Sequence, residues 1–160
     1  MWKKIVFLFG VAFVGLFFLS LDPAGADSSR TKGLIQWRTL KQGKTEAVKR
    51  NMPVLVDFYY PKDCPRCVAL ERDVYGNEHL AEKINQHFIP VRVYLNKELT
   101  GEERKLMTEL KSGGECILAF LDPEGRIIKD SKGKYIGTMA MIPPEKYNWF
   151  MDQALLNLGN

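Results

Sequence analysis

The residues whose types and spacing indicate chemistry in this sequence form the tetrapeptide Cys-Pro-Arg-Cys at residues 64–67. Two cysteines with this spacing either bind a metal ion or cycle between a dithiol and a disulfide. A structural zinc site needs four ligands and usually shows a second pair of Cys or His residues. The two histidines of the chain, His79 and His87, are not close to any cysteine in the sequence. The spacing therefore favours redox chemistry over a metal site.

The tetrapeptide stands where an apolar strand ends and a helix is expected to begin. Backbone N–H groups at a helix start favour a negative charge, so they lower the pKa of the Cys64 thiol and make it the attacking group. Pro65 fits the first helical turn because its missing N–H costs nothing there. The positive charge of Arg66 favours the thiolate and the negative charge of Asp63 opposes it. The sequence leaves open which of the two effects on the pKa of Cys64 is larger. Cys67 is expected to be more buried and to resolve the mixed disulfide.

Strand and helix patterns alternate along the rest of the domain. Strands are expected over residues 34–37, 54–60, 88–95, 116–121, 126–129 and 135–140. Helices are expected over residues 45–50, 68–74, 78–87, 100–111 and 144–159. The first two long strands are joined by helices and should be parallel, whereas the strands on either side of the turn at 122–125 should be antiparallel.

Two sets of side chains are expected in the core. The first set comes from the C-terminal helix and contains Tyr147, Met151, Ala154, Leu155 and Leu158. The second set contains Met107, Met139, Met141 and Met151, whose spacing does not form a copper-binding methionine array.

An apolar segment begins the chain. Lys3 and Lys4 precede an uncharged run, Ile5–Leu21, and the small residues 24–26 follow it. This order is typical of a secretory signal peptide over residues 1–26. The apolar run also reaches the short limit of a membrane span, so an uncleaved anchor is the alternative. In both cases the rest of the protein is expected to be exported, either periplasmic or anchored to the membrane on its extracytoplasmic side.

The composition is that of one globular domain. The chain has 160 residues, of which 46% are hydrophobic and 26% are charged, so residues 34–160 are interpreted as a single domain after a tether at residues 27–33. The formal net charge is only +4, and Lys and Arg form no long runs, so charge gives no support for a nucleic-acid partner. Three cysteines are too few for a disulfide scaffold.

The sequence VLVDFYYPKDCPRCVALERDV at residues 54–74 resembles the active-site region of the thioredoxin superfamily. With GGECILAFLDPEGRII at residues 113–128 and the C-terminal helix, the similarity covers about residues 34–158. The most similar type is an exported thioredoxin-like protein such as the C-terminal periplasmic domain of the bacterial transmembrane disulfide reductase. The resemblance implies an α/β thioredoxin-like fold, in which a central mixed sheet carries helices on both faces.

The same resemblance implies an enzyme that exchanges disulfides with substrate proteins. Reduction is the favoured direction, and a membrane electron donor would have to recharge the cysteines outside the cytoplasm. No cofactor and no metal ion are expected for this activity. The N-terminal segment is the part that would associate with the membrane.

Three positions depart from the family pattern. Asp63 stands where a Trp commonly precedes the first cysteine. Asp57 resembles the buried acid that assists proton transfer to the second cysteine, but it is one residue further from the motif, and a hydrogen-bonded residue at a strand end is the alternative. Cys116 stands where the family has a cis-proline that packs against the disulfide. A trans bond is expected there, because a non-proline cis bond costs about 3 kcal/mol.

The third departure leaves several functions open. The implied fold brings Cys116 close to Cys64 and Cys67, where three thiols can exchange disulfides or bind a soft metal such as Cu(I). Cys116 as a small buried hydrophobic residue is the alternative. A copper or cytochrome-assembly module that uses all three cysteines is therefore a second hypothesis. A catalytically weak scaffold that binds a partner by its surface is the third.

Overall fold

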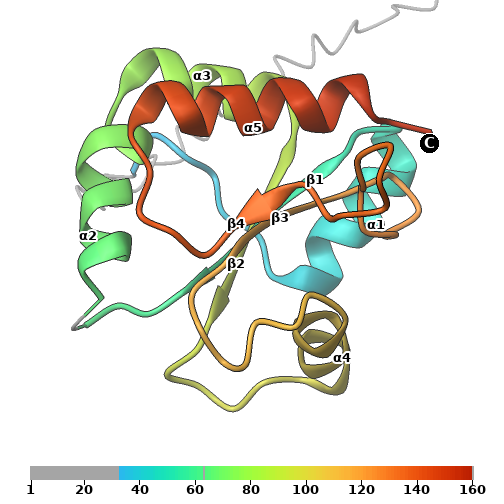
Figure 1. The fold of residues 1–160 in the computed structure, drawn as a ribbon, viewed down its shortest axis with the longest axis horizontal. Coiled ribbons are helices and arrows are strands. Elements are labelled where there is room, and N and C mark those ends of the chain that lie inside the picture. Colours follow the sequence, from blue (N-terminus) through green and yellow to red (C-terminus); the bar gives the residue numbers. More distant parts are fainter. Residues whose placement is uncertain (1–32, 63, 160) are drawn as a thin grey trace, which may run out of the picture. The chain divides into compact units, whose positions relative to one another are not determined.

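The computed structural model describes residues 33–62 and 64–159, and its centre is a four-stranded mixed sheet in the order β2-β1-β3-β4. The strands are β1 Val54–Tyr59, β2 Ile89–Tyr94, β3 Leu118–Leu121 and β4 Gly137–Thr138. β1 is parallel to β2 and antiparallel to β3, which is antiparallel to β4. The parallel pairing of the first two long strands is therefore confirmed (Figure 1).

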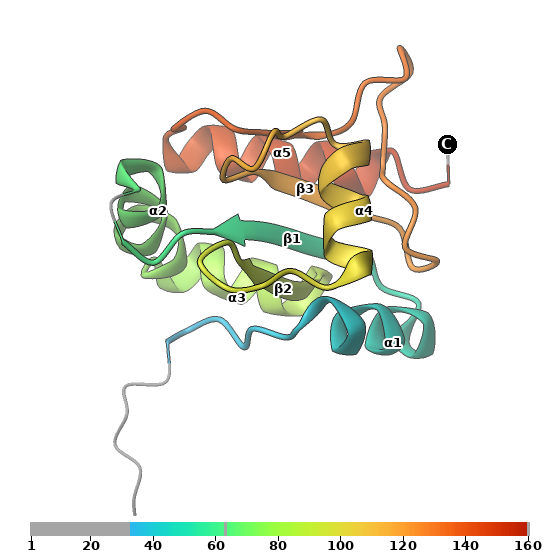
Figure 2. The same cartoon turned by 90° about the horizontal axis from the view of Figure 1, so that it is seen from below.

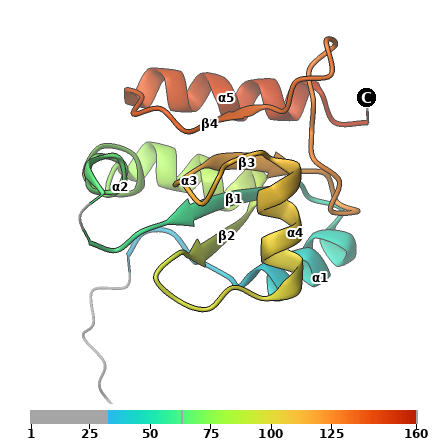
Figure 3. The ribbon, with the colours of Figure 1, turned by 60° about the horizontal axis from the view of Figure 1, so that its bottom comes forward.

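Helices cover both faces of the sheet, as expected (Figure 3). They are α1 Leu40–Arg50, α2 Pro65–Leu70, the π-helix η1 Glu71–Tyr75, α3 Glu78–His87, α4 Gly101–Glu109 and α5 Pro144–Leu156. One face packs against α2, η1, α3 and α5, and the other packs against α1 and α4. α2 lies beyond the carboxyl end of β1, the central strand in this view (Figure 2).

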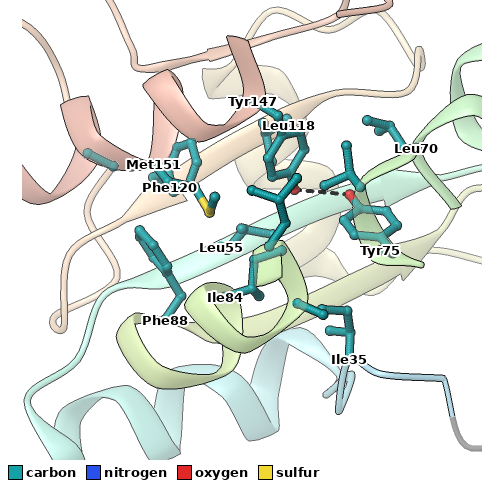
Figure 4. Close-up of a cluster of buried hydrophobic side chains, with 14 of the residues drawn as sticks. Ile35, Leu55, Leu70, Tyr75, Ile84, Phe88, Leu118, Phe120, Tyr147 and Met151 are labelled. Atoms are coloured by element: carbon teal, nitrogen blue, oxygen red, sulfur yellow. Dashed lines mark hydrogen bonds between the residues drawn. The ribbon is translucent and has the colours of Figure 1, made fainter. Parts of the chain in front are cut away.

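The central strand β1 is buried on both faces. Leu55 packs into one core, and Val54, Val56 and Phe58 pack into the other. Successive side chains of a strand point to opposite faces, so a strand that is buried on both faces needs apolar residues at its odd and its even positions. The first core is shown in Figure 4. Its larger side chains are Leu70, Tyr75, Ile84, Phe88, Phe120, Tyr147 and Met151.

Polar caps set the starts of the helices. Thr100 and Glu103 form the capping box predicted from the sequence at the start of α4. Thr39 and Gln42 form a second capping box, which begins α1 five residues earlier than the sequence indicated. Gly43 weakened the helical pattern of that segment, yet the packing of α1 on β2 requires it, because a Cβ at position 43 would overlap the Val91 side chain.

Three expected strands are wrong in whole or in part. Residues 34–37 form no strand, and only an isolated bridge joins the following residue, Arg38, to Val91. Residues 126–129 form only bridges, because tight turns before and after them leave too few residues for a ladder. The region 135–140 is reduced to β4. Gly137 has a φ of 153° and no Cβ, which allows its backbone to lie against Leu118.

Some side chains expected in the core are exposed. Leu158 follows the end of α5 and is 37% exposed, and Leu155 is only partly buried. Met139 and Met141 are exposed because their segment leaves the sheet after β4. Tyr147 is fully buried as expected, and so are Met151 and Ala154.

Two of the sequence-based assignments fall on residues that the structure does not describe. The signal peptide or anchor at residues 1–26 and nearly all of the tether at 27–33 lie outside the described residues, as does Asp63. Within residues 33–62 and 64–159, no helix has the length and apolar character needed to cross a membrane.

Candidate functional site

Three free thiols lie together at the amino end of α2. Cys116 Sγ is 3.3 Å from Cys64 Sγ and 3.3 Å from Cys67 Sγ. All three sulfur atoms lie within 4.8 Å of one another. We call Cys64, Cys67 and Cys116 the thiol cluster. Residues 52 positions apart in the chain therefore share one site, because β3 lies next to β1 and brings Cys116, just before β3, to the start of α2.

Cys64 is the N-terminal cap of α2 and is half-buried. Its sulfur accepts a hydrogen bond from the backbone N–H of Cys67 at 3.2 Å. Burial opposes ionisation, but hydrogen bonds from Cys67 and Cys116 and the charge of Arg66 outweigh it and lower the pKa of the Cys64 thiol. The helix start thus stabilises a thiolate that remains open to solvent on one side.

Cys67 is only 1% exposed and lies in the first turn of α2. Burial is the main cause that raises the pKa of its thiol well above the ordinary range, and the neighbouring Cys64 thiol adds to it. The N–H of Tyr60 donates to its sulfur at 3.4 Å and acts in the opposite direction. The two cysteines of the tetrapeptide therefore have pKa values shifted in opposite directions, so at a given pH Cys64 carries more thiolate than Cys67.

Cys116 resembles Cys67 more than Cys64. Burial and the neighbouring Cys64 raise the pKa of its thiol, although hydrogen bonding with Cys67 and the charge of Arg66 act against this. The described residues contain no cis peptide bond. The bond before Cys116 is accordingly trans, as expected for a position without proline.

A second set of polar residues lies between the sheet and α2, next to the thiol cluster. Asp57 Oδ1 is 3.6 Å from Arg66 Nη1, and Asp57 Oδ2 is 3.4 Å from Arg92 Nη2. Arg92 Nη1 is also 2.6 Å from Glu71 Oε1. We call Asp57, Arg66, Arg92 and Glu71 the ionic cluster. Only Glu71 in this cluster is substantially exposed, at 40% of its side chain.

Arg66 belongs to the tetrapeptide but points into the ionic cluster. Only 7% of the residue is exposed. Within the described residues, none of its three guanidinium nitrogens has a hydrogen-bond partner, and its ion pair with Asp57 is long. Its charge still acts on Cys64, in the direction expected from the sequence. Pro65 occupies the first position of α2, also as expected.

Asp57 is fully buried in the interior of β1, opposite Arg92 in the register. The alternative interpretation placed Asp57 at a strand end, and that placement is wrong. The carboxylate faces two guanidinium groups, so its charge is balanced by the ionic cluster.

Arg92 and Glu71 were missed in the sequence. Arg92 lies 3.9 Å from the centre of the Trp37 ring and 4.1 Å from that of Tyr59, so two aromatic faces hold its guanidinium group. The apolar strand 88–95 contains a single Arg, and this Arg points to the same face of the sheet as Asp57 in the neighbouring strand. That lone charge was the signal that could have indicated the pair. Glu71 lies in η1 and forms an ion pair with Arg92.

An open hollow of about 690 Å³ adjoins Cys64. It is lined by Cys64, Pro65, Val68, Ala69, Arg72 and Met141. Val68 and Met141 are 61% and 63% exposed, so the surface beside the half-buried thiol is largely apolar. A larger hollow of about 1110 Å³ lies between α4, the segment 122–135 and the end of α5, and it contains none of the cysteines.

The thioredoxin-like family model matches residues 36–123, which is more than half of the chain. The chain belongs to the thioredoxin-like family. Mouse anterior gradient protein 3 is 26% identical over 121 residues, which cover 74% of this chain and 68% of that protein.

Two solved structures share the fold. A thioredoxin from Thermus thermophilus has a TM-score of 0.61 and 16% identity, and the match covers 78% of this chain and 90% of that one. The C-terminal domain of Neisseria meningitidis DsbD in the oxidised form has a TM-score of 0.51 and 18% identity, with 71% and 92% covered. These likenesses confirm the thioredoxin-like α/β fold that the sequence predicted.

Proposed function

We propose that this protein is an exported thiol–disulfide oxidoreductase that reduces disulfides in other proteins. The observation that carries the proposal is the contrast within the tetrapeptide. Cys64 caps a helix, is half-buried and has a lowered pKa, whereas Cys67 one turn later is buried and has a raised pKa. An attacking thiolate next to a protected resolving thiol is the arrangement that disulfide exchange requires.

The exchange proceeds in two balanced steps. The Cys64 thiolate attacks one sulfur of a substrate disulfide, a mixed disulfide forms, and the other substrate sulfur leaves as a thiolate. Cys67 then loses its proton and attacks Cys64, which releases the second substrate sulfur and leaves a Cys64–Cys67 disulfide. The substrate gains two electrons and the protein loses two. A dithiol donor must reduce the protein before the next cycle.

The apolar hollow beside Cys64 supports a protein substrate. Val68 and Met141 offer exposed apolar contacts on the side from which a disulfide reaches the sulfur. Burial of such contacts favours association with little dependence on sequence, since hydrophobic attraction is non-directional. A reductase that acts on several proteins needs recognition of this kind.

Reduction, export and the membrane donor are further parts of the proposal. The similarity of residues 54–74 to exported thioredoxin-like proteins favours the reducing direction. The basic, apolar and small-residue order of residues 1–26 supports export, with or without cleavage. A donor in the membrane would then return electrons to the Cys64–Cys67 disulfide.

Reduction of insulin disulfides with dithiothreitol as the electron source tests the activity. The wild type should accelerate the reaction, and the Cys64→Ser variant should return it to the rate of dithiothreitol alone. The Cys67→Ser variant should accumulate a mixed disulfide between Cys64 and the substrate. The exposed pair variant Glu102→Gln, which alters neither cysteine, serves as the control.

Turnover by Cys64→Ser at the wild-type rate would remove Cys64 from the nucleophile role. The equilibrium potential of the Cys64–Cys67 couple then tests the direction. A potential as reducing as that of thioredoxins supports reduction, and a strongly oxidising one contradicts it. The mass of the protein recovered from an exporting host tests whether residues 1–26 are removed.

A further inference from the structure

We propose that the thiol cluster is also a binding site for a soft monovalent metal ion, with Cu(I) as the ion that fits it. This site does not depend on disulfide exchange with proteins. It uses Cys64, Cys67 and Cys116 as three ligands, including the cysteine that the exchange steps leave unused.

The spacing of the sulfur atoms suits a three-coordinate ion. Thiolate sulfur binds metal ions of this size at about 2.3 Å, so three sulfurs in a plane around one ion stand about 4 Å apart. Cys116 Sγ is 3.3 Å from each of the other two, and no pair exceeds 4.8 Å. The ligands therefore need to move by less than about 1 Å, a change that side-chain rotation allows.

The donor set selects the ion. Thiolates are soft ligands and favour Cu(I) and Zn(II) among common metals. Structural zinc sites are almost always four-coordinate, but no His, Asp or Glu of the described residues joins the three cysteines. Cu(I) is stable with three thiolates alone, so it matches the number as well as the type of ligand.

The surroundings support the charge that such a site carries. Three thiolates around one monovalent cation have a net charge of −2. The N–H of Cys67 donates to Cys64 and the N–H of Tyr60 donates to Cys67, and a backbone N–H that donates to sulfur favours its ionised form. The buried Arg66 adds a positive charge that acts on Cys64 and Cys116. Such outer contacts orient thiolate ligands and stabilise their charge.

Binding and disulfide exchange exclude each other. An ion that enters as Cu(I) remains Cu(I), and each thiol that coordinates it releases its proton. A disulfide between any two of the cysteines removes two of the ligands. The site therefore binds metal only in the fully reduced protein, and bound metal blocks the attacking sulfur of Cys64.

Anaerobic titration of the reduced protein with Cu(I), in competition with a chromophoric Cu(I) chelator, tests the proposal. One ion per chain should bind, and X-ray absorption should show about three sulfur neighbours. Cys116→Ser replaces the third ligand at nearly constant size and should weaken binding at least about 100-fold, more than the loss of an outer contact usually does. Met141→Leu, which removes an exposed thioether near Cys64, should keep the wild-type affinity.

Circular dichroism of each variant verifies that it is folded, and the sulfur count on the wild type does not depend on any variant. Equal affinity of Cys116→Ser and wild type would overturn the proposal, as would two sulfur neighbours or tighter binding of Zn(II) than of Cu(I). Insulin reduction is measured separately on the metal-free protein. Failure of metal binding therefore leaves the exchange activity intact, and the reverse also holds.

Discussion

The thiol cluster and the ionic cluster both include residues of the tetrapeptide 64–67, but they place their polar groups in opposite environments. In the thiol cluster, the environment drives the pKa values of neighbouring identical groups apart, which keeps one of them reactive. In the ionic cluster, opposite charges lie 3.4 and 3.6 Å apart around Asp57 and are shielded from water. A partly exposed group can react, whereas a buried paired charge mainly holds the structure in one arrangement.

Arg66 connects the two regions. Its backbone lies in the first turn of α2 beside Cys64, and its side chain lies in the ionic cluster. Among the described residues, no donor of its guanidinium group has a hydrogen-bond partner, and its ion pair with Asp57 is 3.6 Å long. A buried cation with incomplete pairing has a strong field, because little water screens it. The comparison therefore indicates that the ionic cluster contributes to the site through charge.

Loss of the central carboxylate should have the largest effect on stability. Asp57→Asn leaves Arg66 and Arg92 as buried cations without their shared partner. Removal of one member of a buried ion pair costs about 3–5 kcal/mol, and urea denaturation of the reduced protein measures the change in the free energy of unfolding.

The matched control is Glu102→Gln, which breaks an exposed pair with Lys44. That change should cost less than about 1 kcal/mol. If Asp57→Asn were no more destabilising than Glu102→Gln, the ionic cluster would not be a structural element.

The contrast within the thiol cluster predicts a pH-dependent order of alkylation. A lowered pKa gives Cys64 more thiolate at a given pH, and a raised pKa gives Cys67 less. Iodoacetamide should therefore modify Cys64 at least about tenfold faster than Cys67 at pH 7, the factor that one unit of pKa difference produces. The pH at which the rate is half its maximum should be lower for Cys64 than for Cys67 and Cys116, because the pKa of Cys64 is lowered and the pKa values of the other two are raised.

Peptide mass spectrometry of the labelled protein measures the three rates. In urea the cysteines should react at similar rates, because unfolding removes both burial and the helix start. Equal rates in the folded protein at pH 7 would show that the fold does not separate the two thiols.

The connection between the two regions predicts the smallest effect. Arg66→Met removes the charge and keeps most of the side-chain volume, and Arg92 still pairs with Asp57. The free energy of unfolding should change less than in Asp57→Asn, because Arg92 still balances the charge of Asp57 and the buried guanidinium group that is removed has no hydrogen-bond partner among the described residues. The pKa of Cys64 should rise, because the charge of Arg66 lowers it.

Thiolate absorbance near 240 nm against pH measures that pKa. Arg72→Met is the control, because Arg72 is exposed and paired with Asp73. If the pKa of Cys64 were the same in Arg66→Met and in wild type, the charge of the ionic cluster would have no effect on the thiol cluster.

Local patterns predicted the parts of the fold that depend on neighbouring residues. The apolar residues 54–60 indicated the central strand, and Thr100 with Glu103 indicated a helix start. The edge strand at 34–37 failed because strand pairing depends on partners distant in the chain. The ion pair of Glu71 with Arg92 was missed for the same reason, since Glu71 lies in η1 and Arg92 lies on β2.

The sequence by itself determined that two cysteines one helical turn apart follow a buried strand, because hydrophobic pattern and spacing are properties of local chain geometry. Only the tertiary structure decided which groups surround them. The antiparallel pairing of β3 with β1 brought Cys116 to 3.3 Å from both sulfurs, and the register of β1 with β2 put Arg92 opposite Asp57. Interactions between charges and between sulfurs act over a few ångströms, so they depend on distances that only the folded chain sets.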